Sequence, residues 1–170
     1  MEMNKNLILI GMMASGKSTI GRLLAKKLGR KFFDTDFIIE RKLKMKISQI
    51  FKKKGEFKFR ELERQVVLKL LNKKKTIISV GGGAFINRKI RKTANEKGIT
   101  IWLNWNSNTL IDRIRKKNSM RPIASSLSDS KLRDLLVNRS KFYSLAKYNI
   151  ECENMEKGEI VNKIIDTLKL

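Results

Sequence analysis

Residues 6–18 read NLILIGMMASGKS, and this stretch decides the fold of the 170-residue chain. Its first five residues form a compact apolar run, which is typical of a buried β-strand, and residues 17–28 have the apolar spacing of an amphipathic helix. The segment between them, residues 11–18, fits the pattern G-x-x-x-x-G-K-[ST]. That pattern marks a phosphate-binding loop when it follows a strand and opens a helix, as it does here.

The residues of this loop have distinct expected roles toward a bound nucleotide. Glycines let the backbone curl so that its N–H groups point inward, and the helix N-terminus adds positive potential. Lys17 is expected to reach the β- and γ-phosphates of ATP, and the Ser18 hydroxyl to ligate Mg²⁺. A glycine-capped turn with an incidental lysine is the alternative. The predicted ATP-binding residues of the loop are Gly11, Met13, Ala14, Ser15, Gly16, Lys17, Ser18 and Thr19.

The rest of the chain alternates short apolar runs with longer amphipathic ones. Strand-like runs occupy residues 6–10, 31–33, 76–80, 100–103 and 148–152. Helical patterns occupy residues 17–28, 36–45, 47–51, 56–72, 87–96, 108–115, 131–145 and 155–168. Strands that alternate with helices indicate a parallel sheet covered on both faces. We therefore expect an α/β protein with three α/β/α layers, a central parallel five-stranded sheet and a single domain over residues 1–170.

The composition excludes several classes of function. With one cysteine, Cys152, the chain cannot form an internal disulfide, and without histidine it has no Cys/His zinc site and no imidazole base. No apolar run approaches the roughly 20 residues that span a bilayer. The N-terminal apolar run is too short for the core of a signal peptide. We therefore expect a cytoplasmic protein with no membrane partner.

The net charge is +23, from 39 Lys and Arg against 16 Asp and Glu. A balance of this kind attracts polyanions, so a nucleic-acid-binding protein is one hypothesis. Lysine runs at 52–54 and 73–75, with plentiful isoleucine and asparagine, also fit a drift in genomic base composition, which we favour. Aromatic residues make up only 7% of the chain, too few for stacking platforms, and no RNA- or DNA-binding motif is present. We therefore expect no nucleic-acid partner.

Two carboxylates, Asp34 and Asp36, come at the end of the second predicted strand, at the edge of the sheet where ligands bind. Alternate side chains of an extended segment point the same way, so both are expected to face the crevice. One could hold the hydration shell of a metal ion while the other meets a substrate hydroxyl. Capping of the next helix by Asp36 is the structural alternative, and the two roles can coexist.

Other features carry weak signals when each is taken alone. Arg60, in the sequence FRELE, is typical of a helix residue paired with a nearby Glu. The three glycines at 81–83 follow the third strand, and such a run is costly in conformational entropy unless something approaches the backbone closely. The polar stretch 118–130 is predicted to be a mobile loop. Arg121 within it and Arg139 on the next helix would each normally be surface cations.

Taken together, these motifs resemble the shikimate kinase family, a group of small P-loop kinases with the nucleoside-monophosphate-kinase fold. The resemblance covers residues 6 to about 151, and the matching stretches occur in the family's order. They are GMMASGKSTIGRLLAKKLG, FFDTDFIIE, FKKKGEFKFRELE, SVGGGA, the pair Arg121-Pro122, and NRSKFYSLAKY. The prediction for the residues after 151 rests on their helical pattern alone.

The resemblance implies that ATP phosphorylates the 3-hydroxyl of shikimate. Arg60 and Arg139 would grip the substrate carboxylate, for which guanidinium groups are suited, and Glu63 would orient Arg60. Asp36 would meet the ring hydroxyls and accept the proton of the attacking one. The implied shikimate-binding residues are Asp36, Arg60, Gly81, Gly82, Gly83 and Arg139, with the main binding region over residues 34–63.

The resemblance also implies roles around the transferred phosphoryl group. Lys17 and Arg121, the latter from a closing lid over residues 118–130, would stabilise its charge, and Arg121 would contact ATP. Ser18 would ligate Mg²⁺, and Asp34 would act through a water molecule of its shell. The implied catalytic residues are therefore Lys17, Asp36 and Arg121. We expect the enzyme to act as a monomer.

Two departures from the family pattern are visible in the sequence. Ala14 stands where the family usually has glycine, and its methyl group is tolerable only if the local φ is negative. Arg121-Pro122-Ile123 shortens the usual leucine-rich continuation of the lid. Gluconate kinases share the loop and similar size, and nucleotide kinases share the fold, so each is an alternative. The two aspartates, Arg60 and the triple glycine favour shikimate.

Overall fold

The structure, a computed structural model, describes residues 4–116 and 127–170. Five strands, β1 (Asn6–Ile10), β2 (Lys31–Asp34), β3 (Thr76–Ser79), β4 (Gly98–Asn104) and β5 (Tyr148–Glu151), form one sheet. Its order is β2-β3-β1-β4-β5, and every pair of neighbours is parallel. The helices are α1 (Lys17–Leu28), α2 (Thr35–Leu43), α3 (Ile47–Leu71), α4 (Arg88–Lys97), α5 (Ser107–Lys116), α7 (Asp129–Tyr143) and α8 (Lys157–Leu168), with a short 3₁₀ helix, η2 (Ala84–Ile86), before α4.

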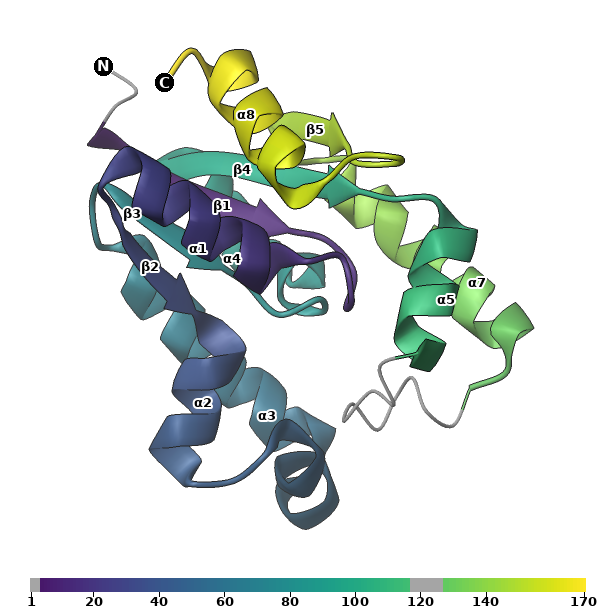
Figure 1. The fold of residues 1–170 in the computed structure, drawn as a ribbon. Coiled ribbons are helices and arrows are strands. Elements are labelled where there is room, and N and C mark those ends of the chain that lie inside the picture. The colour runs from purple at the N-terminus through teal and green to yellow at the C-terminus, as the bar shows by residue number, and fades with distance from the viewer. Residues whose placement is uncertain (1–3, 117–126) are drawn as a thin grey trace.

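Alternate residues of β1 face opposite helical layers. Leu7 and Leu9 belong to a core that includes side chains of α1 and α8, whereas Ile8 and Ile10 belong to a second core with side chains of α3, α4, α5 and α7. All of β1 is buried, because it lies in the middle of the sheet with helices on both faces. Figure 1 shows α1 and α8 on one face and α4 on the other. The predicted three-layer fold with a parallel five-stranded sheet is confirmed.

Two predicted helices are joined in the structure into one kinked element, α3. The kink is at Gly55, whose φ of 77° and ψ of 165° are not helical. Ile39 of α2 packs with Ile50 and Phe59 of α3 in a small third core. This pair of helices follows the carboxyl end of β2 and extends beyond the edge of the sheet (Figure 1).

The end of β2 differs from the extended segment that the sequence predicts. The strand stops at Asp34, and α2 begins at the next residue, Thr35. One carboxylate oxygen of Asp34 accepts hydrogen bonds from the backbone N–H groups of Asp36, at 3.0 Å, and Phe37, at 3.2 Å. Asp34 is therefore the helix cap, and the alternative in which Asp36 caps the helix is wrong. Because Asp36 is helical, alternation along a strand does not set its direction.

Part of the predicted mobile stretch 118–130 lies outside the described residues, and so does Arg121. At its described end, the Ser128 side chain accepts a hydrogen bond from the backbone N–H of Lys131 and caps α7. The lid and the role of Arg121 therefore stay predictions. Among the helices of the described ranges, none is both long and apolar enough to cross a membrane.

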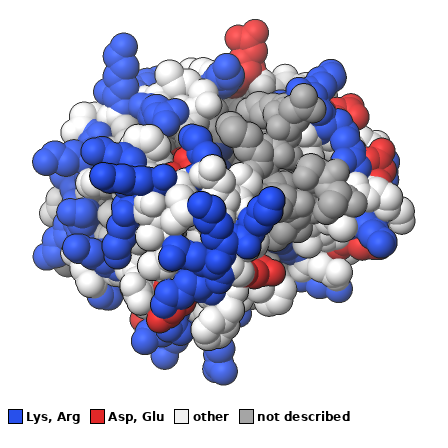
Figure 2. All heavy atoms as spheres, turned by 90° about the horizontal axis from the view of Figure 1, so that it is seen from below, with Lys and Arg blue, Asp and Glu red and all other residues white. Residues whose placement is uncertain are grey.

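Basic side chains are abundant on the face of the molecule that carries α2 and α3. Figure 2 looks at the end that carries α2 and α3, and Lys and Arg cover much of this face while Asp and Glu are few. Both lysine runs, residues 52–54 and 73–75, are exposed. Solvent and salt screen such exposed charges, so their effect on the fold is small compared with burial of the two main cores.

The buried side chain of Asn6 links β1 to the start of β3 by hydrogen bonds. Its oxygen accepts hydrogen bonds from the backbone N–H of Thr76, at 3.1 Å, and from the Thr76 hydroxyl, at 2.9 Å. Its amide donates to the carbonyl oxygen of Lys73 at 2.6 Å. One side chain thus satisfies polar groups of a turn and of a neighbouring strand that would otherwise be costly to bury.

We expect Asn6→Leu to lower the free energy of unfolding by about 2–4 kcal/mol, because several buried polar groups lose their partner. Urea denaturation followed by circular dichroism measures the change. Asn162→Ala is the matched control, since Asn162 makes an exposed hydrogen bond to Lys27 and its loss should cost less than about 0.5 kcal/mol. Equal stability of the Asn6→Leu variant and the unaltered protein would contradict the role of Asn6.

Candidate active site

The phosphate-binding loop joins β1 to α1, as the sequence predicts, and glycine conformations shape it. Gly11 has a φ of 139° and Gly16, the N-cap of α1, a φ of 87°. A Cβ atom on Gly11 would also lie only 3.0 Å from the carbonyl oxygen of Leu103. Both positions therefore need glycine, because side chains strain a positive φ and, at Gly11, there is no room beside β4.

Lys17 is 7% exposed and lies against its own loop. Its ammonium group donates hydrogen bonds to the carbonyl oxygens of Gly11, at 2.9 Å, and Met12, at 2.7 Å, and to the Ser15 hydroxyl at 3.3 Å. These contacts hold a positive charge at the turn where the motif is expected to take up phosphates.

Ala14 corrects one expectation drawn from the sequence. A methyl group in this loop was expected to require a negative φ, but Ala14 has a φ of 63°. This left-handed conformation costs free energy for any residue with a Cβ atom. The loop therefore keeps the shape that glycine would allow, and other contacts have to stabilise it.

Ser18 and Asp34 bring two oxygen ligands together beside the loop. The Ser18 hydroxyl donates a hydrogen bond to the second carboxylate oxygen of Asp34, whose first oxygen caps α2. Carboxylate and hydroxyl oxygens are donors that Mg²⁺ prefers, usually with few protein ligands and with phosphate oxygens completing its shell. The pair fits such an ion, although no group of three or more acidic, Cys or His residues forms a metal site within the described residues.

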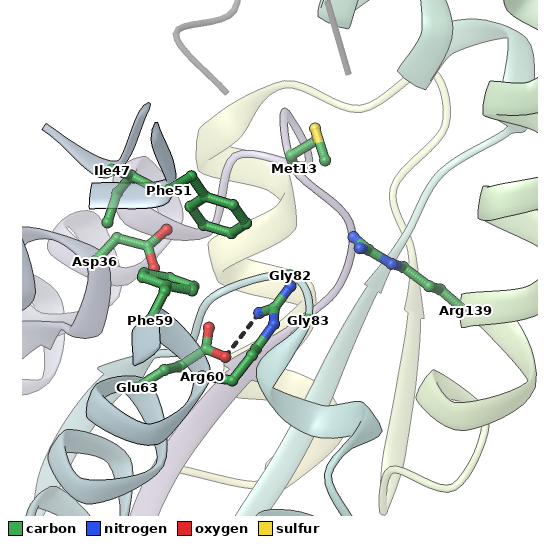
Figure 3. Close-up of a pocket in the computed structure, with 10 residues that line it drawn as sticks. All are labelled: Met13, Asp36, Ile47, Phe51, Phe59, Arg60, Glu63, Gly82, Gly83 and Arg139. Atoms are coloured by element: carbon green, nitrogen blue, oxygen red, sulfur yellow. Dashed lines mark hydrogen bonds and ion pairs between the residues drawn. The ribbon is translucent and has the colours of Figure 1, made fainter. Parts of the chain in front are cut away.

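Asp36 lines a separate pocket, so the two aspartates lie at different parts of the site: Asp34 beside Ser18 and Asp36 in the pocket. The pocket lies at the carboxyl edge of the sheet, between the α2–α3 pair, the glycine turn after β3, and α7 (Figure 3). Its lining residues are Met13, Asp36, Ile47, Phe51, Phe59, Arg60, Glu63, Gly82, Gly83 and Arg139.

Arg60 is held by two carboxylates of its own helix. Its guanidinium donates to the buried carboxylate of Glu63 at 2.7 Å and to the exposed carboxylate of Glu56 at 3.2 Å. Burial lowers the pKa of the guanidinium, but the charges and hydrogen bonds of Glu63 and Glu56 outweigh burial, so the pKa of Arg60 is raised. The side chain is therefore a permanent cation in the pocket, and the predicted pairing with a nearby Glu is confirmed.

The glycine turn at 81–83 is crowded by the side chains of this pocket. A Cβ atom on Gly81 would lie 2.8 Å from a carboxylate oxygen of Asp36, and one on Gly83 would overlap the guanidinium of Arg60. The backbone N–H of Gly81 donates to the Thr35 hydroxyl at 3.0 Å, and the Tyr143 hydroxyl donates to the carbonyl oxygen of Gly82. The sequence predicts that other groups approach the backbone of the three glycines closely, and these contacts confirm that prediction.

Arg139 reaches the pocket from α7, opposite Arg60. Figure 3 shows the two side chains approaching the glycine turn from different sides. Arg139 is 7% exposed, and its guanidinium lies 3.5 Å from the Met12 sulfur. From local signals alone, Arg60 is a helix residue paired with a Glu and Arg139 a surface cation, whereas the structure brings both to one pocket with Asp36.

A second, larger cavity of about 600 Å³ opens beside the phosphate-binding loop. Ala14, Ser15, Gly16 and Thr19, four of the residues predicted to bind ATP, line it. Met13, also predicted to bind ATP, lines the first pocket. The other lining residues are Ile20, Trp105, Arg113, Met155, Glu156, Lys157, Gly158 and Ile160.

Sequence reasoning missed several of the residues that line the two cavities. Phe51 and Phe59 lie within a quoted motif, but no signal marks their rings as pocket walls. Trp105 and Arg113 come shortly after β4, and only their closeness to the carboxyl edge could have suggested them.

Cys152 is fully buried in the core, and burial raises the pKa of its thiol to about 12, so it takes no part as a nucleophile.

A phosphate-binding loop, an oxygen pair beside it and an arginine-flanked pocket on one edge of a parallel sheet define a P-loop kinase of small molecules. The family model for shikimate kinase matches residues 13–169. The chain is 38% identical to a shikimate kinase of Sulfurihydrogenibium sp. (strain YO3AOP1), with 97% of this chain and 98% of that protein covered.

Solved structures agree with these sequence matches. A shikimate kinase from Acinetobacter baumannii, in complex with shikimate, superposes with a TM-score of 0.91 at 36% identity, over 99% of this chain and 94% of that one. A gluconokinase from Sinorhizobium meliloti 1021 gives a TM-score of 0.60 at 15% identity, over 99% and 94%, which shows a shared fold alone. The chain belongs to the shikimate kinase family.

We expect Glu63→Gln to lower the free energy of unfolding by about 1–2 kcal/mol, because it removes a charged hydrogen bond to a guanidinium that is still partly solvated. Glu56→Gln is the matched control on the same arginine. Its carboxylate is exposed, so its loss should cost less than about 0.5 kcal/mol. Denaturant titration of both variants measures the difference, and equal effects would show that burial of Glu63 is unimportant.

Proposed function

We propose that this protein transfers the γ-phosphoryl group of ATP to the 3-hydroxyl of shikimate, giving shikimate 3-phosphate. The observation that carries the proposal is the placement of Asp36, Arg60 and Arg139 around one pocket at the sheet edge that also bears the phosphate-binding loop. The family of the chain supports the choice of substrate.

Two guanidinium groups on opposite sides of a pocket suit a small carboxylic acid. Each can donate paired hydrogen bonds to a carboxylate, and Arg60 is already oriented by Glu63 and Glu56. The cavity has a volume of about 30 Å³, room for about one or two water molecules. A ring-shaped acid therefore needs the lining side chains to move outward as it enters.

Asp36 is the proposed proton acceptor. It lies on the first turn of α2, with a carboxylate oxygen near Gly81, and the family resemblance places it at the ring hydroxyls. A carboxylate within reach of the attacking hydroxyl can take its proton as the oxygen–phosphorus bond forms and the bond to the leaving ADP breaks. Gly82 and Gly83 supply a wall against which the ring can lie.

Lys17, the loop amides and the N-terminus of α1 are proposed to hold the phosphates of ATP in the second cavity. Ser18 and, through a water molecule, Asp34 are the residues proposed to hold Mg²⁺. When bound, the ion would neutralise charge on the phosphates. Arg121, outside the described residues, is proposed to approach the same phosphoryl group from the segment 118–130.

Gluconate kinase is the alternative function, since the fold and the loop are shared. A nucleic-acid-binding role is favoured only by the basic surface in Figure 2, which is compatible with a site for two anionic substrates. The paired arginines would suit the carboxylate of either acid, so the choice of shikimate is supported by the family match over nearly the whole chain. We also propose a cytoplasmic monomer, because both substrates are small soluble anions and the site uses residues of one chain.

The purified protein, given Mg·ATP, should release ADP with shikimate as acceptor and not with gluconate, because the chain belongs to the shikimate kinase family. A coupled ADP-release assay measures both rates. Lys17→Ala is the control for contaminating kinases and should lower kcat by orders of magnitude. Preference for gluconate, or turnover that survives Lys17→Ala, would contradict the proposed function.

Arg60→Ala and Arg139→Ala should each raise the KM for shikimate by about 10- to 150-fold, since each removes a charged hydrogen bond to the carboxylate. The KM for ATP should change little, because the nucleotide cavity is separate. Arg41→Ala is the matched control, an exposed arginine of α2 outside the pocket. An increase confined to the KM for ATP would show that the pocket is wrongly assigned.

A further inference from the structure

The phosphate-binding loop contains a strained residue, Ala14, whose φ of 63° is the left-handed conformation that favours glycine. The strain is specific to this position, since Gly11 and Gly16, which also have positive φ, are glycines. Without other contacts, the loop would relax toward conformations in which Ala14 has a negative φ and its neighbours turn differently. Something must therefore hold the loop in the conformation observed.

Trp105 makes a hydrogen bond to the loop from outside it. Its indole N–H donates to the carbonyl oxygen of Ser15, the residue after Ala14, at 3.0 Å. The backbone N–H of Ser15 donates within the loop to the Met12 carbonyl at 3.3 Å. The peptide groups on the two sides of Ser15 are thus fixed, one by the loop itself and one by Trp105.

Trp105 is itself held firmly. It follows the end of β4, where the Asn104 carbonyl accepts a hydrogen bond from the backbone N–H of Cys152 at 2.9 Å. On its other side, the backbone N–H of Asn106 donates to the Glu153 carboxylate at 3.1 Å. The Arg113 guanidinium stacks over the indole, 3.6 Å from the ring centroid. The donor therefore comes from a braced turn and not from a freely rotating side chain.

We propose that Trp105 is a positioning residue for nucleotide binding, which keeps the phosphate-binding loop in the left-handed Ala14 conformation through its hydrogen bond to Ser15. This rests on the nucleotide-binding part of the proposed function and adds a residue that acts through the loop. Loss of the hydrogen bond reduces the population of loops that can bind phosphates, and the apparent affinity for nucleotide falls by the same fraction.

The identity of residue 14 gives the proposal a specific test. If Trp105 acts by offsetting the strain at Ala14, then Ala14→Gly, which removes the strain, should make the hydrogen bond less important. An indole that merely packs in the core, or that contacts the nucleotide directly, would matter equally with either residue at position 14.

The experiment measures ADP binding by calorimetry in four proteins: unaltered, Trp105→Phe, Ala14→Gly, and the double variant. Trp105→Phe should weaken ADP binding about two- to tenfold, the value of one hydrogen bond. With Gly at position 14, the same substitution should weaken it by less than about twofold, because the loop no longer needs the contact. In the coupled assay the KM for ATP should rise in parallel, while the KM for shikimate stays unchanged.

Tyr148→Phe is the control, since it alters an aromatic side chain at the start of β5, away from the carboxyl edge of the sheet, and should leave ADP affinity unchanged. Thermal unfolding checks that Trp105→Phe folds. Should it not, Trp105→His is the second variant, with the same dependence on residue 14 expected.

The proposal would be overturned if Trp105→Phe weakened ADP binding equally with Ala and with Gly at position 14, or if it did not weaken ADP binding at all. If ADP binds as expected but shikimate is not phosphorylated, the proposed reaction fails and the inference about Trp105 stands. Failure of the unaltered protein to bind ADP would overturn both.

Discussion

Parallel pairing of β1 with β3 on one side and β4 on the other is the constraint on which the site depends. In a parallel sheet every strand ends at the same edge, so the segments that follow the strands gather there. The phosphate-binding loop follows β1, Asp34 ends β2, the glycine turn follows β3 and Trp105 follows β4. Residues that are far apart in sequence thereby meet, and residues of one loop line both cavities.

Charge in this site is balanced locally although the chain as a whole is strongly basic. Arg60 is shared between a buried and an exposed carboxylate, so it is oriented before any acid arrives. An incoming carboxylate adds to a prearranged cation and does not have to order it, which reduces the entropy lost on binding. The exposed lysines act at longer range, where they raise the local concentration of anions at low salt.

The sequence predicts the fold and the phosphate-binding loop, because strand periodicity and the glycine-lysine pattern are local signals, whereas Arg60 and Arg139 were assigned to a substrate pocket only through the family resemblance. It treats residues 34–36 wrongly as one extended segment, since the side chain of Asp34 accepts two backbone hydrogen bonds and a helix starts at the next residue. Local alternation cannot anticipate such a cap. Phe51 and Phe59 were not assigned as pocket walls, because only the kink at Gly55 and the packing of α2 on α3 bring them there.

Ala14 shows most clearly what a motif leaves out. The pattern accepts any residue at this position, and the local rule for an alanine is a negative φ. The positive φ observed is compatible with the fold because a partner 90 residues further along the chain bonds to the adjacent carbonyl. Trp105 belongs to none of the motifs quoted from the sequence. The strain at Ala14 is thus compensated from the neighbouring strand, because the hydrogen-bond donor, Trp105, directly follows the end of β4.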